Sequence, residues 1–525
     1  MSSTGPSPLF VPLSPSPRLV AQMTGLSLRQ SELEVAQQRN LKRMIRRIRA
    51  SRVPRHHVGA SPRTAKLASV LRKTPMPSLS LPAAEVNRPP PVDDSPEWSD
   101  DPGDDGLSLR KMHLTMDIAD APSPEELARR VATLFNDVFE PEPSIAPEHV
   151  GVARLSGAMT NCVFMVTVTP APHVAATAAV TAVLRSSVGE EERVQLPTKY
   201  LLRVYGAGVD EFLSRDKELY WLSQLTSLGF GPRLYGIFGN GRLEEFLEST
   251  TLTRADIRNP STSKHIARRM CELHSLVSYY RPFGGQPSTN AVDLSGAPEL
   301  WANVAAWLRL VEKKWARIRH VCANNPQCLA ILDNWPRVQQ AVAKLRVIVA
   351  RANSPVVFAH DDLQYGNILR LEGTGELVVV DFEYAGYNYR GFDIANHFCE
   401  WMADYHGPQP HTLAEDWYPT LDHRKAFLRT YVKAKAFLDA NMKADKGVVE
   451  NDRDHVKLRR GTLGDDRIKA EIDLLEREVV HFVPASHLHW GVWGLLQACS
   501  SEIDFDYVSY AAQRLSIFLR MVEEF

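Results

Sequence analysis

The hydrophobic pattern divides the chain into a strand-rich region followed by a helical one. Short runs of alternating or continuous apolar residues predict strands over 150–155, 162–168, 200–205, 234–238 and 243–246. A helix predicted over 214–228 interrupts these strands and ends at Gly229, as helices commonly do. From residue 252 the apolar spacing becomes three and four, which predicts helices over 263–280, 301–317 and 335–351.

We expect the folded part of the chain to begin near residue 121, with a helix whose first residues form an N-terminal capping motif. Ser123 is followed by proline and, three residues after the serine, by Glu126, which together form a capping box with proline at the first helical position. Residues 1–115 are rich in serine, proline and charge, a composition that cannot bury enough apolar surface to fold. We therefore expect a disordered N-terminal extension over 1–115.

The remaining chain is expected to form two domains that meet near residue 247. We predict a small β-rich N-lobe over 116–247 and a large helical C-lobe over 248–525, with a site at their junction. Two stretches, 170–197 and 443–466, read as insertions. The fold class that follows is α+β.

Charge is distributed unevenly although the formal net charge is only −1. Residues 39–55 contain basic side chains and no acid, whereas residues 93–105 contain acidic side chains and no base. Opposed blocks of this kind are usually solvated tail segments. Because the core shows no extended basic face, we expect no nucleic-acid partner.

Cysteine usage and hydropathy predict a cytoplasmic protein. The six cysteines are scattered and include no Cys-x-x-Cys pair, so neither a disulfide framework nor a zinc site is expected. The first residues lack the basic and apolar regions of a secretory signal. No apolar stretch is long enough for a transmembrane segment.

The candidate chemistry lies in two neighbouring motifs of the C-lobe. Residues 360–367 read His-Asp-Asp-Leu-Gln-Tyr-Gly-Asn, which contains a His-x-Asp pair with an asparagine five residues beyond the aspartate. An apolar run over 377–380 then ends on Asp381 and Phe382. The spacing matches the kinase pattern His-x-Asp-x-x-x-x-Asn followed by Asp-Phe-x, and it predicts a kinase-type phosphotransferase.

Each residue of these motifs has an expected role. Asp362 is the candidate base that accepts the proton of a substrate hydroxyl. Asp381, Asn367 and Gln364 are oxygen donors suited to Mg²⁺. His360 is expected to hold the loop by hydrogen bonds. Asp361 is interpreted either as a further metal ligand or as a surface residue, and the second interpretation is preferred.

A nucleotide site is predicted on the N-lobe. The turn after residue 155 carries small residues whose backbone N–H groups can approach phosphates, namely Gly157, Ala158, Met159, Thr160 and Asn161. Arg203 lies on a predicted strand, where it would either pair with phosphate or remain a surface side chain. Glu245 and Leu247 lie where a hinge would offer backbone groups to adenine.

A substrate pocket is predicted from aromatic residues near the C-terminus. Trp490 and Trp493 are three residues apart and therefore share a helix face, and Phe505 and Tyr510 follow. Such rings can bind a quaternary ammonium through their π faces, although a tryptophan pair in a helical core is the commoner role. Glu400 and Tyr405 would add a negative charge and another ring.

The two motif regions together resemble the choline/ethanolamine kinase family, most closely its fungal-type choline kinases. The resemblance covers about 150–525 and depends on 357–367 and on 381–401, where the second block begins Asp381-Phe382-Glu383-Tyr384. It implies a two-lobed protein-kinase-like fold, ATP and Mg²⁺ as cofactors, and transfer of the γ-phosphate to choline, the first step of phosphatidylcholine synthesis through CDP-choline. Family members are commonly cytosolic homodimers.

The resemblance also assigns roles to individual residues. It implies that Asp362 is the base, that Gln364, Asn367 and Asp381 serve the metal and phosphates, and that the aromatic set with Glu400 holds choline. Two residues depart from the family pattern. Asp361 replaces the usual asparagine or glycine, and Ala158 replaces a glycine in the phosphate turn. Ethanolamine kinase and a catalytically inactive kinase-like scaffold are the alternatives.

Overall fold

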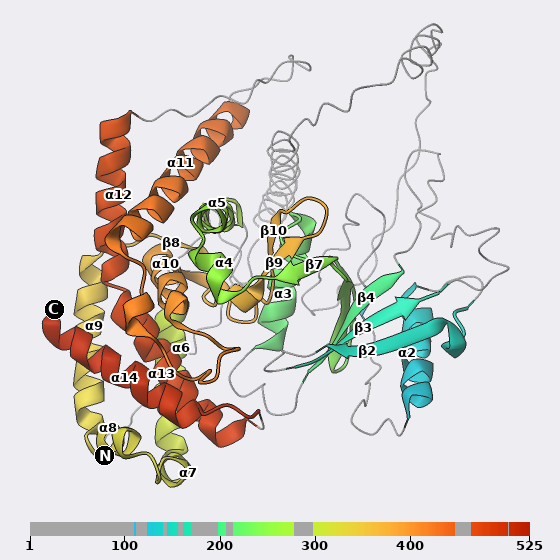
Figure 1. The fold of residues 1–525 in the computed structure, drawn as a ribbon, viewed down its shortest axis with the longest axis horizontal. Helices are drawn as coiled ribbons and strands as arrows, with labels where there is room; N and C mark the ends of the chain where they lie inside the picture. Colours follow the sequence, from blue (N-terminus) through green and yellow to red (C-terminus); the bar gives the residue numbers. More distant parts are fainter. Residues whose placement is uncertain are drawn as a thin grey trace, which may run out of the picture.

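The computed structural model describes residues 110–111, 123–139, 144–155, 161–169, 198–205, 214–277, 298–446, 464–501 and 503–525. Nearly all of the predicted N-terminal extension, the 170–197 insertion and most of the 443–466 insertion lie outside these residues. Figure 1 shows a smaller strand-rich part joined to a larger helical part, which is the two-lobed α+β arrangement that the sequence predicts.

The smaller part is built on a six-stranded sheet with strand order β1-β5-β6-β4-β3-β2. Its strands are β1 (Arg110–Lys111), β2 (Val150–Leu155), β3 (Asn161–Val168), β4 (Lys199–Tyr205), β5 (Leu234–Phe238) and β6 (Gly241–Glu245). All neighbours are antiparallel except β1 and β5. The predicted strands are confirmed with small shifts at their ends. β1 was not predicted, because two basic residues show no apolar alternation.

Helix α2 (Pro124–Phe139) covers one face of this sheet (Figure 1). Glu126 N donates to Ser123 Oγ over 3.2 Å, which confirms the predicted start of the helix. The Glu126 carboxylate pairs with Arg129 and Arg130. The buried face of α2 and the facing sheet residues form a small separate core that includes Val131, Leu134, Phe135, Val138, Tyr200 and Leu202.

Helix α3 (Arg215–Ser227) packs on the helical part of the molecule. Ser214 caps its start, as Lys217 N donates to Ser214 Oγ over 3.4 Å. The Trp221 ring lies 4.5 Å from that of Phe358 and 5.7 Å from that of Tyr387. The apolar face of α3 therefore belongs to the main core and not to the core between the sheet and α2.

The larger part consists of helices around two short sheets. The helices are α4 (Arg254–Arg258), α5 (Pro260–Leu276), α6 (Glu299–Lys313), α7 (Trp315–Val321), α8 (Pro326–Asp333), α9 (Trp335–Arg351), α10 (Arg390–Cys399), α11 (Leu421–Lys446), α12 (Asp465–Val480), α13 (Val483–Ser500) and α14 (Tyr507–Glu524). The prediction of one continuous helix over 301–317 was wrong. The structure has two helices there, α6 and α7, with a break at Lys314, where φ is −95° and ψ is 13°. Within the described part of the chain, no helix is long and apolar enough to cross a membrane.

The short sheets bring the two motif regions together. β8 (Val356–Ala359) pairs with β11 (Gly386–Tyr389), and β9 (Ile368–Leu371) lies between β7 (Ser249–Thr251) and β10 (Leu377–Val379). Residue 360 follows β8 directly, and residue 381 comes two residues after β10. Val380 N donates to Asn367 O over 3.0 Å, so the two motif segments lie side by side.

Candidate active site

The loop 360–367 is fixed in place by His360. Asp362 N donates to His360 Nδ1 over 3.3 Å, and His360 Nε2 lies 3.0 Å from Val380 O. Because Nδ1 accepts, Nε2 carries the proton and donates to the carbonyl. Burial lowers the pKa of His360, which agrees with a neutral ring. His360 therefore connects the two motif segments, as predicted.

Asp362 and Asn367 contact each other within this loop. Asn367 Nδ2 donates to Asp362 Oδ2 over 2.8 Å and to Asp362 O over 2.9 Å. Gln364 Oε1 accepts from Gly366 N over 2.6 Å, while its Nε2 lies 3.4 Å from Asn367 Oδ1. Burial, followed by the charges of Glu400 and other acids, raises the pKa of Asp362 well above its ordinary value. Such a carboxylate has the high proton affinity that a general base needs.

Asp361 is buried, so its interpretation as a surface residue was wrong. Its backbone φ of +65° lies in the left-handed region, and the residue is only 1% exposed. Asp361 N donates to Asp393 Oδ1 over 2.9 Å, and Asn388 Nδ2 donates to Asp361 Oδ2 over 2.9 Å. Burial, followed by the charge of Asp393, raises the pKa of Asp361 well above its ordinary value.

Replacing Asp361 by asparagine is expected to stabilise the protein at neutral pH, because a buried amide needs no proton to stay neutral. The folded state keeps the Asp361 proton to a higher pH than the unfolded chain does, so the wild type loses stability above about pH 4. The advantage of Asp361→Asn should be absent near pH 4 and grow by up to about 1.4 kcal/mol per pH unit. Urea unfolding across this pH range measures it, and an advantage that shrinks as pH rises would contradict the interpretation.

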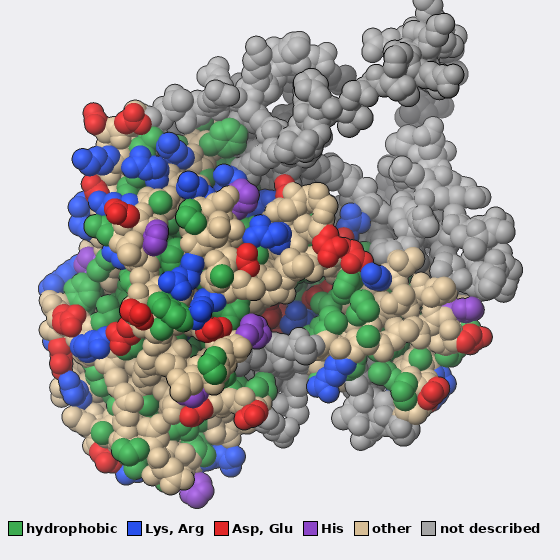
Figure 2. All heavy atoms as spheres, viewed as in Figure 1, with side chains coloured by type: hydrophobic (Ala, Val, Ile, Leu, Met, Phe, Trp, Pro, Cys, Tyr) green, Lys and Arg blue, Asp and Glu red, His purple; other side chains and the backbone are tan. Residues whose placement is uncertain are grey.

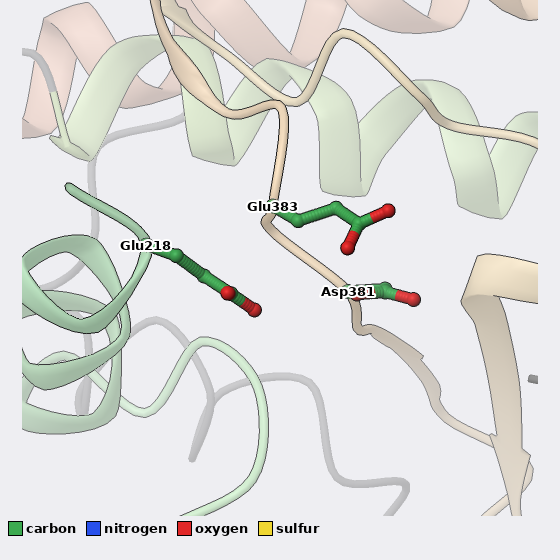
Figure 3. Close-up of side chains that lie close together, drawn as sticks. All are labelled: Glu218, Asp381 and Glu383. Carbon is green, nitrogen blue, oxygen red and sulfur yellow. The ribbon is translucent and has the colours of Figure 1, made fainter. Parts of the chain in front are cut away.

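Three carboxylates converge next to this loop. Asp381, which also has a left-handed φ of +66°, and Glu383 lie on one segment, and Glu218 extends toward them from α3 (Figure 3). One oxygen from each lies within 4.8 Å of the others. Burial, followed by the charges of Asp381 and Glu218, raises the pKa of Glu383 to about 8. Arginine side chains neutralise part of this charge, since Arg203 lies 3.5 Å from Asp381 and Arg215 lies 3.9 Å from Glu383. The all-oxygen donor set nevertheless fits a hard cation such as Mg²⁺.

Sequence reasoning identified Asp381 but missed the other two carboxylates. Glu383 lies two residues after Asp381 in the same motif, and this spacing was a usable signal. Glu218 carries no local signal, because only the packing of α3 brings it here. Arg242 Nη1 lies 2.7 Å from one Glu218 oxygen and Arg215 Nη1 lies 2.9 Å from the other.

Only part of the predicted nucleotide site falls among the described residues. Gly157, Ala158, Met159 and Thr160 lie outside them, and Asn161 begins β3 without a described side chain. Arg203 on β4 is buried, and its Nη1 lies 3.5 Å from Asp381 Oδ1, so it is not a surface strand residue. Charged side chains are visible in the depression where the two parts meet (Figure 2).

The predicted hinge forms the end of β6 and the segment after it. Glu245 N donates to Arg233 O over 2.8 Å, and Arg233 N donates to Glu245 Oε2 over 3.1 Å. Ser249 Oγ donates to Leu247 O over 2.9 Å. The hinge is therefore held by its neighbours on both sides.

The six residues of the predicted substrate pocket form one connected group. The rings of Trp490 and Trp493 on α13 are 5.4 Å apart, and Trp493 lies 6.3 Å from Tyr510 on α14. Phe505 lies 5.7 Å from Tyr510. Tyr405 OH donates to Glu400 Oε2 over 2.7 Å. Tyr405 N also donates to the OH of Tyr365 in the loop 360–367 over 2.7 Å, so this group adjoins the loop that carries the candidate base.

Two residues that contact the predicted substrate pocket, one aromatic and one basic, were not predicted from the sequence. Trp493 Nε1 donates to Tyr384 OH over 2.9 Å, and the Tyr384 ring lies 5.2 Å from that of Trp490. Tyr384 lies three residues after Asp381, so it joins the aromatic group to the acidic segment. Arg514 Nη2 donates to Glu400 Oε1 over 2.7 Å from a fully buried position on α14. Neither contact follows from a motif.

A loop with a candidate base, an adjoining carboxylate cluster and a two-lobed fold are the features of a kinase-type phosphotransferase. The family described as choline/ethanolamine kinase matches residues 152–519. The chain is 33% identical over 382 residues to human choline/ethanolamine kinase, covering 72% of this chain and 81% of that protein. It is 30% identical over 386 residues to choline kinase of Schizosaccharomyces pombe, covering 69% and 74%. The chain belongs to the choline/ethanolamine kinase family.

Solved structures show the same fold. An ethanolamine kinase of Plasmodium vivax superposes with a TM-score of 0.53 at 22% identity, covering 77% of this chain and 90% of that chain. A choline kinase of Cryptosporidium parvum superposes with a TM-score of 0.50 at 20% identity, covering 75% and 95%. The expectation of a two-lobed protein-kinase-like fold is confirmed.

Proposed function

We propose that this protein is a choline kinase, which transfers the γ-phosphate of ATP to the choline hydroxyl and yields phosphocholine and ADP. The observation that carries the proposal is the position of Asp362. The loop that carries Asp362 contacts both neighbouring groups. His360 Nε2 lies 3.0 Å from the oxygen of Val380, the residue before Asp381, and Tyr405 N donates to Tyr365 OH over 2.7 Å. A base in that position can accept a proton from an alcohol whose cationic end is held by the rings.

The loop supplies the residues for proton transfer. Asp362 accepts the hydroxyl proton as the bond between the alcohol oxygen and phosphorus forms. Asn367 keeps the carboxylate oriented through its bond to Oδ2. The presence of Asp362, Asn367 and Asp381 together also argues against an inactive scaffold.

The acidic cluster fits magnesium. Asp381 and Glu383 would hold Mg²⁺, with Gln364 and Asn367 in the adjoining loop completing the site for metal and phosphates. Bound Mg²⁺ neutralises charge on the transferred phosphoryl group. Arg203 would pair with phosphate from the sheet side, where its guanidinium already lies 3.5 Å from Asp381. The turn of Gly157, Ala158, Met159, Thr160 and Asn161 would approach the phosphates, and Glu245 and Leu247 would border adenine.

The aromatic group suits a trimethylammonium head. Trp490 and Trp493, with Tyr405, Phe505 and Tyr510, would supply the π faces that attract a cation. A primary ammonium needs hydrogen-bond acceptors, and here each oxygen of Glu400 already accepts one hydrogen bond, from Tyr405 or Arg514, which leaves less acceptor capacity for a primary ammonium. The pocket therefore favours choline over ethanolamine.

The substrate preference can be measured directly. We expect kcat/KM for choline to exceed that for ethanolamine by about tenfold, a difference of about 1.4 kcal/mol, which lies within the range of cation–π interactions. An assay coupled to ADP release, offered each alcohol and an aminoglycoside as control acceptor, measures the ratio. Equal or higher values for ethanolamine would assign the protein as an ethanolamine kinase.

The family resemblance leads to two further expectations. We propose a homodimer and a cytoplasmic location, in which the enzyme supplies phosphocholine to phosphatidylcholine synthesis. Sedimentation equilibrium of the full chain tests the first, and fractionation of cells tests the second.

A further inference from the structure

Asn396 lies between the catalytic loop and the aromatic pocket and contacts both. It is on α10, and its side chain is completely buried. Its Oδ1 accepts from Trp490 Nε1 over 2.7 Å and from Ser486 Oγ over 2.8 Å, both on α13. Its Nδ2 donates to the backbone oxygen of Asp361 over 3.0 Å.

The donor pattern fixes the orientation of this amide. An indole N–H can only donate, so the group facing Trp490 must be the oxygen of Asn396. The nitrogen then faces Asp361 O, the carbonyl of the residue immediately before the candidate base. One side chain thus connects the indole ring and the loop that carries Asp362 through buried hydrogen bonds.

This connection determines where the ring stands relative to the base. A buried hydrogen bond is costly to leave unmade, so the Trp490 indole is held at one rotation about its side-chain bonds. A cation–π contact depends strongly on the position of the ring face. Only two carbons separate the cationic head from the reacting hydroxyl of the substrate, so the ring and the base must be held at a matching separation.

We infer that Asn396 is a positioning residue that sets the Trp490 ring against the catalytic loop and thereby favours a quaternary over a primary ammonium substrate. The inference rests on the proposed function. Asn396 contacts the catalytic loop and Trp490, and it acts on the substrate only through Trp490. Ethanolamine, whose ammonium is held by hydrogen bonds, depends less on the ring.

Kinetics of Asn396→Ala test the inference. We expect KM for choline to rise about tenfold to a hundredfold, the effect of losing one or two buried hydrogen bonds, while KM for ATP changes by less than about twofold. The choline to ethanolamine ratio of kcat/KM should fall. Trp490→Phe, which keeps a ring but removes the indole N–H, should change these quantities in the same direction.

The double variant separates positioning from general damage. If Asn396 acts through Trp490, combining the two changes should raise KM for choline no further than the stronger single change does. Asn136→Ala is the control, because Asn136 on α2 is also an asparagine whose amide makes two hydrogen bonds, in its case with the backbone of Ile145. It should lower thermal stability without altering either KM.

Specific results would overturn the inference. One such result is an unchanged KM for choline in Asn396→Ala, and another is an equal rise of KM for choline and KM for ATP. A third is a double variant whose rise in KM for choline is the product of the rises in the two single variants. Should Asn396→Ala fail to fold, an unchanged KM for choline in Trp490→Phe alone would overturn it. A wild type that phosphorylates neither choline nor ethanolamine would instead reject the proposed function before any variant is compared.

Discussion

Replacement of Asp362 by alanine is expected to lower kcat for choline phosphorylation by about 10²- to 10⁴-fold, the range supplied by general base catalysis. The alcohol then has no positioned acceptor for its proton, and Asn367 loses the carboxylate oxygen to which it donates. Nucleotide binding should persist, because Arg203 and the sheet are unaffected. Coupled kinetics measure the first effect, and calorimetry with ATP measures the second.

The neighbouring carboxylate provides the control for this variant. Asp361→Asn also removes an acid from the loop, but Asp361 Oδ2 faces Asn388 and not the substrate pocket. It should retain most of the wild-type turnover. If Asp362→Ala kept more than about a hundredth of wild-type kcat, the least reduction expected of a lost base, the base would have to be another group.

Replacement of Asp381 by alanine is expected to reduce kcat by about 10²- to 10³-fold, the usual cost of removing one group that stabilises transition-state charge. The same change should raise the Mg²⁺ concentration needed for half-maximal activity, because the metal loses one carboxylate ligand and only Glu383 remains on that segment. Titration of activity with Mg²⁺ at saturating ATP measures both effects.

A surface aspartate serves as the comparison for Asp381. Asp333→Ala breaks an exposed ion pair with Arg319, and such pairs contribute little to stability. It should leave kcat and the Mg²⁺ requirement unchanged. An Asp381→Ala protein with normal Mg²⁺ dependence would place the metal elsewhere.

The sequence predicts the elements of this fold well where a local signal sets their ends. α9 begins at Trp335 and ends at Arg351 as its apolar spacing predicts, and Ser214 and Ser123 start the helices that follow them. The loop residues around Asp362 are likewise local, because the hydrogen bonds of His360 and Asn367 are made within the two motifs. Contacts between residues that are close in the sequence can be predicted from the spacing of the residues in the motif.

Features that depend on distant packing could not be predicted. Asp361 appeared to be a surface residue because its partner Asn388 lies 27 residues away. Glu218 enters the acidic cluster only because α3 packs on the helical part of the molecule, and the break at Lys314 follows no proline or glycine. Arg514 meets Glu400 across 114 residues. In each case the long-range contact, and not the local sequence, determines the environment.

The packing of α3 has a consequence for control of the enzyme. In protein kinases the corresponding helix can be displaced, and activation depends on its position. Here Trp221, only 1% exposed, stacks near Phe358 and Tyr387 in the main core, so an outward swing of α3 would expose a large aromatic surface to water. The same packing places Glu218 beside Asp381 and Glu383 in the absence of any ligand. We therefore expect this packing to oppose an on–off switch of that type, and we expect the output of the enzyme to follow the supply of alcohol and nucleotide.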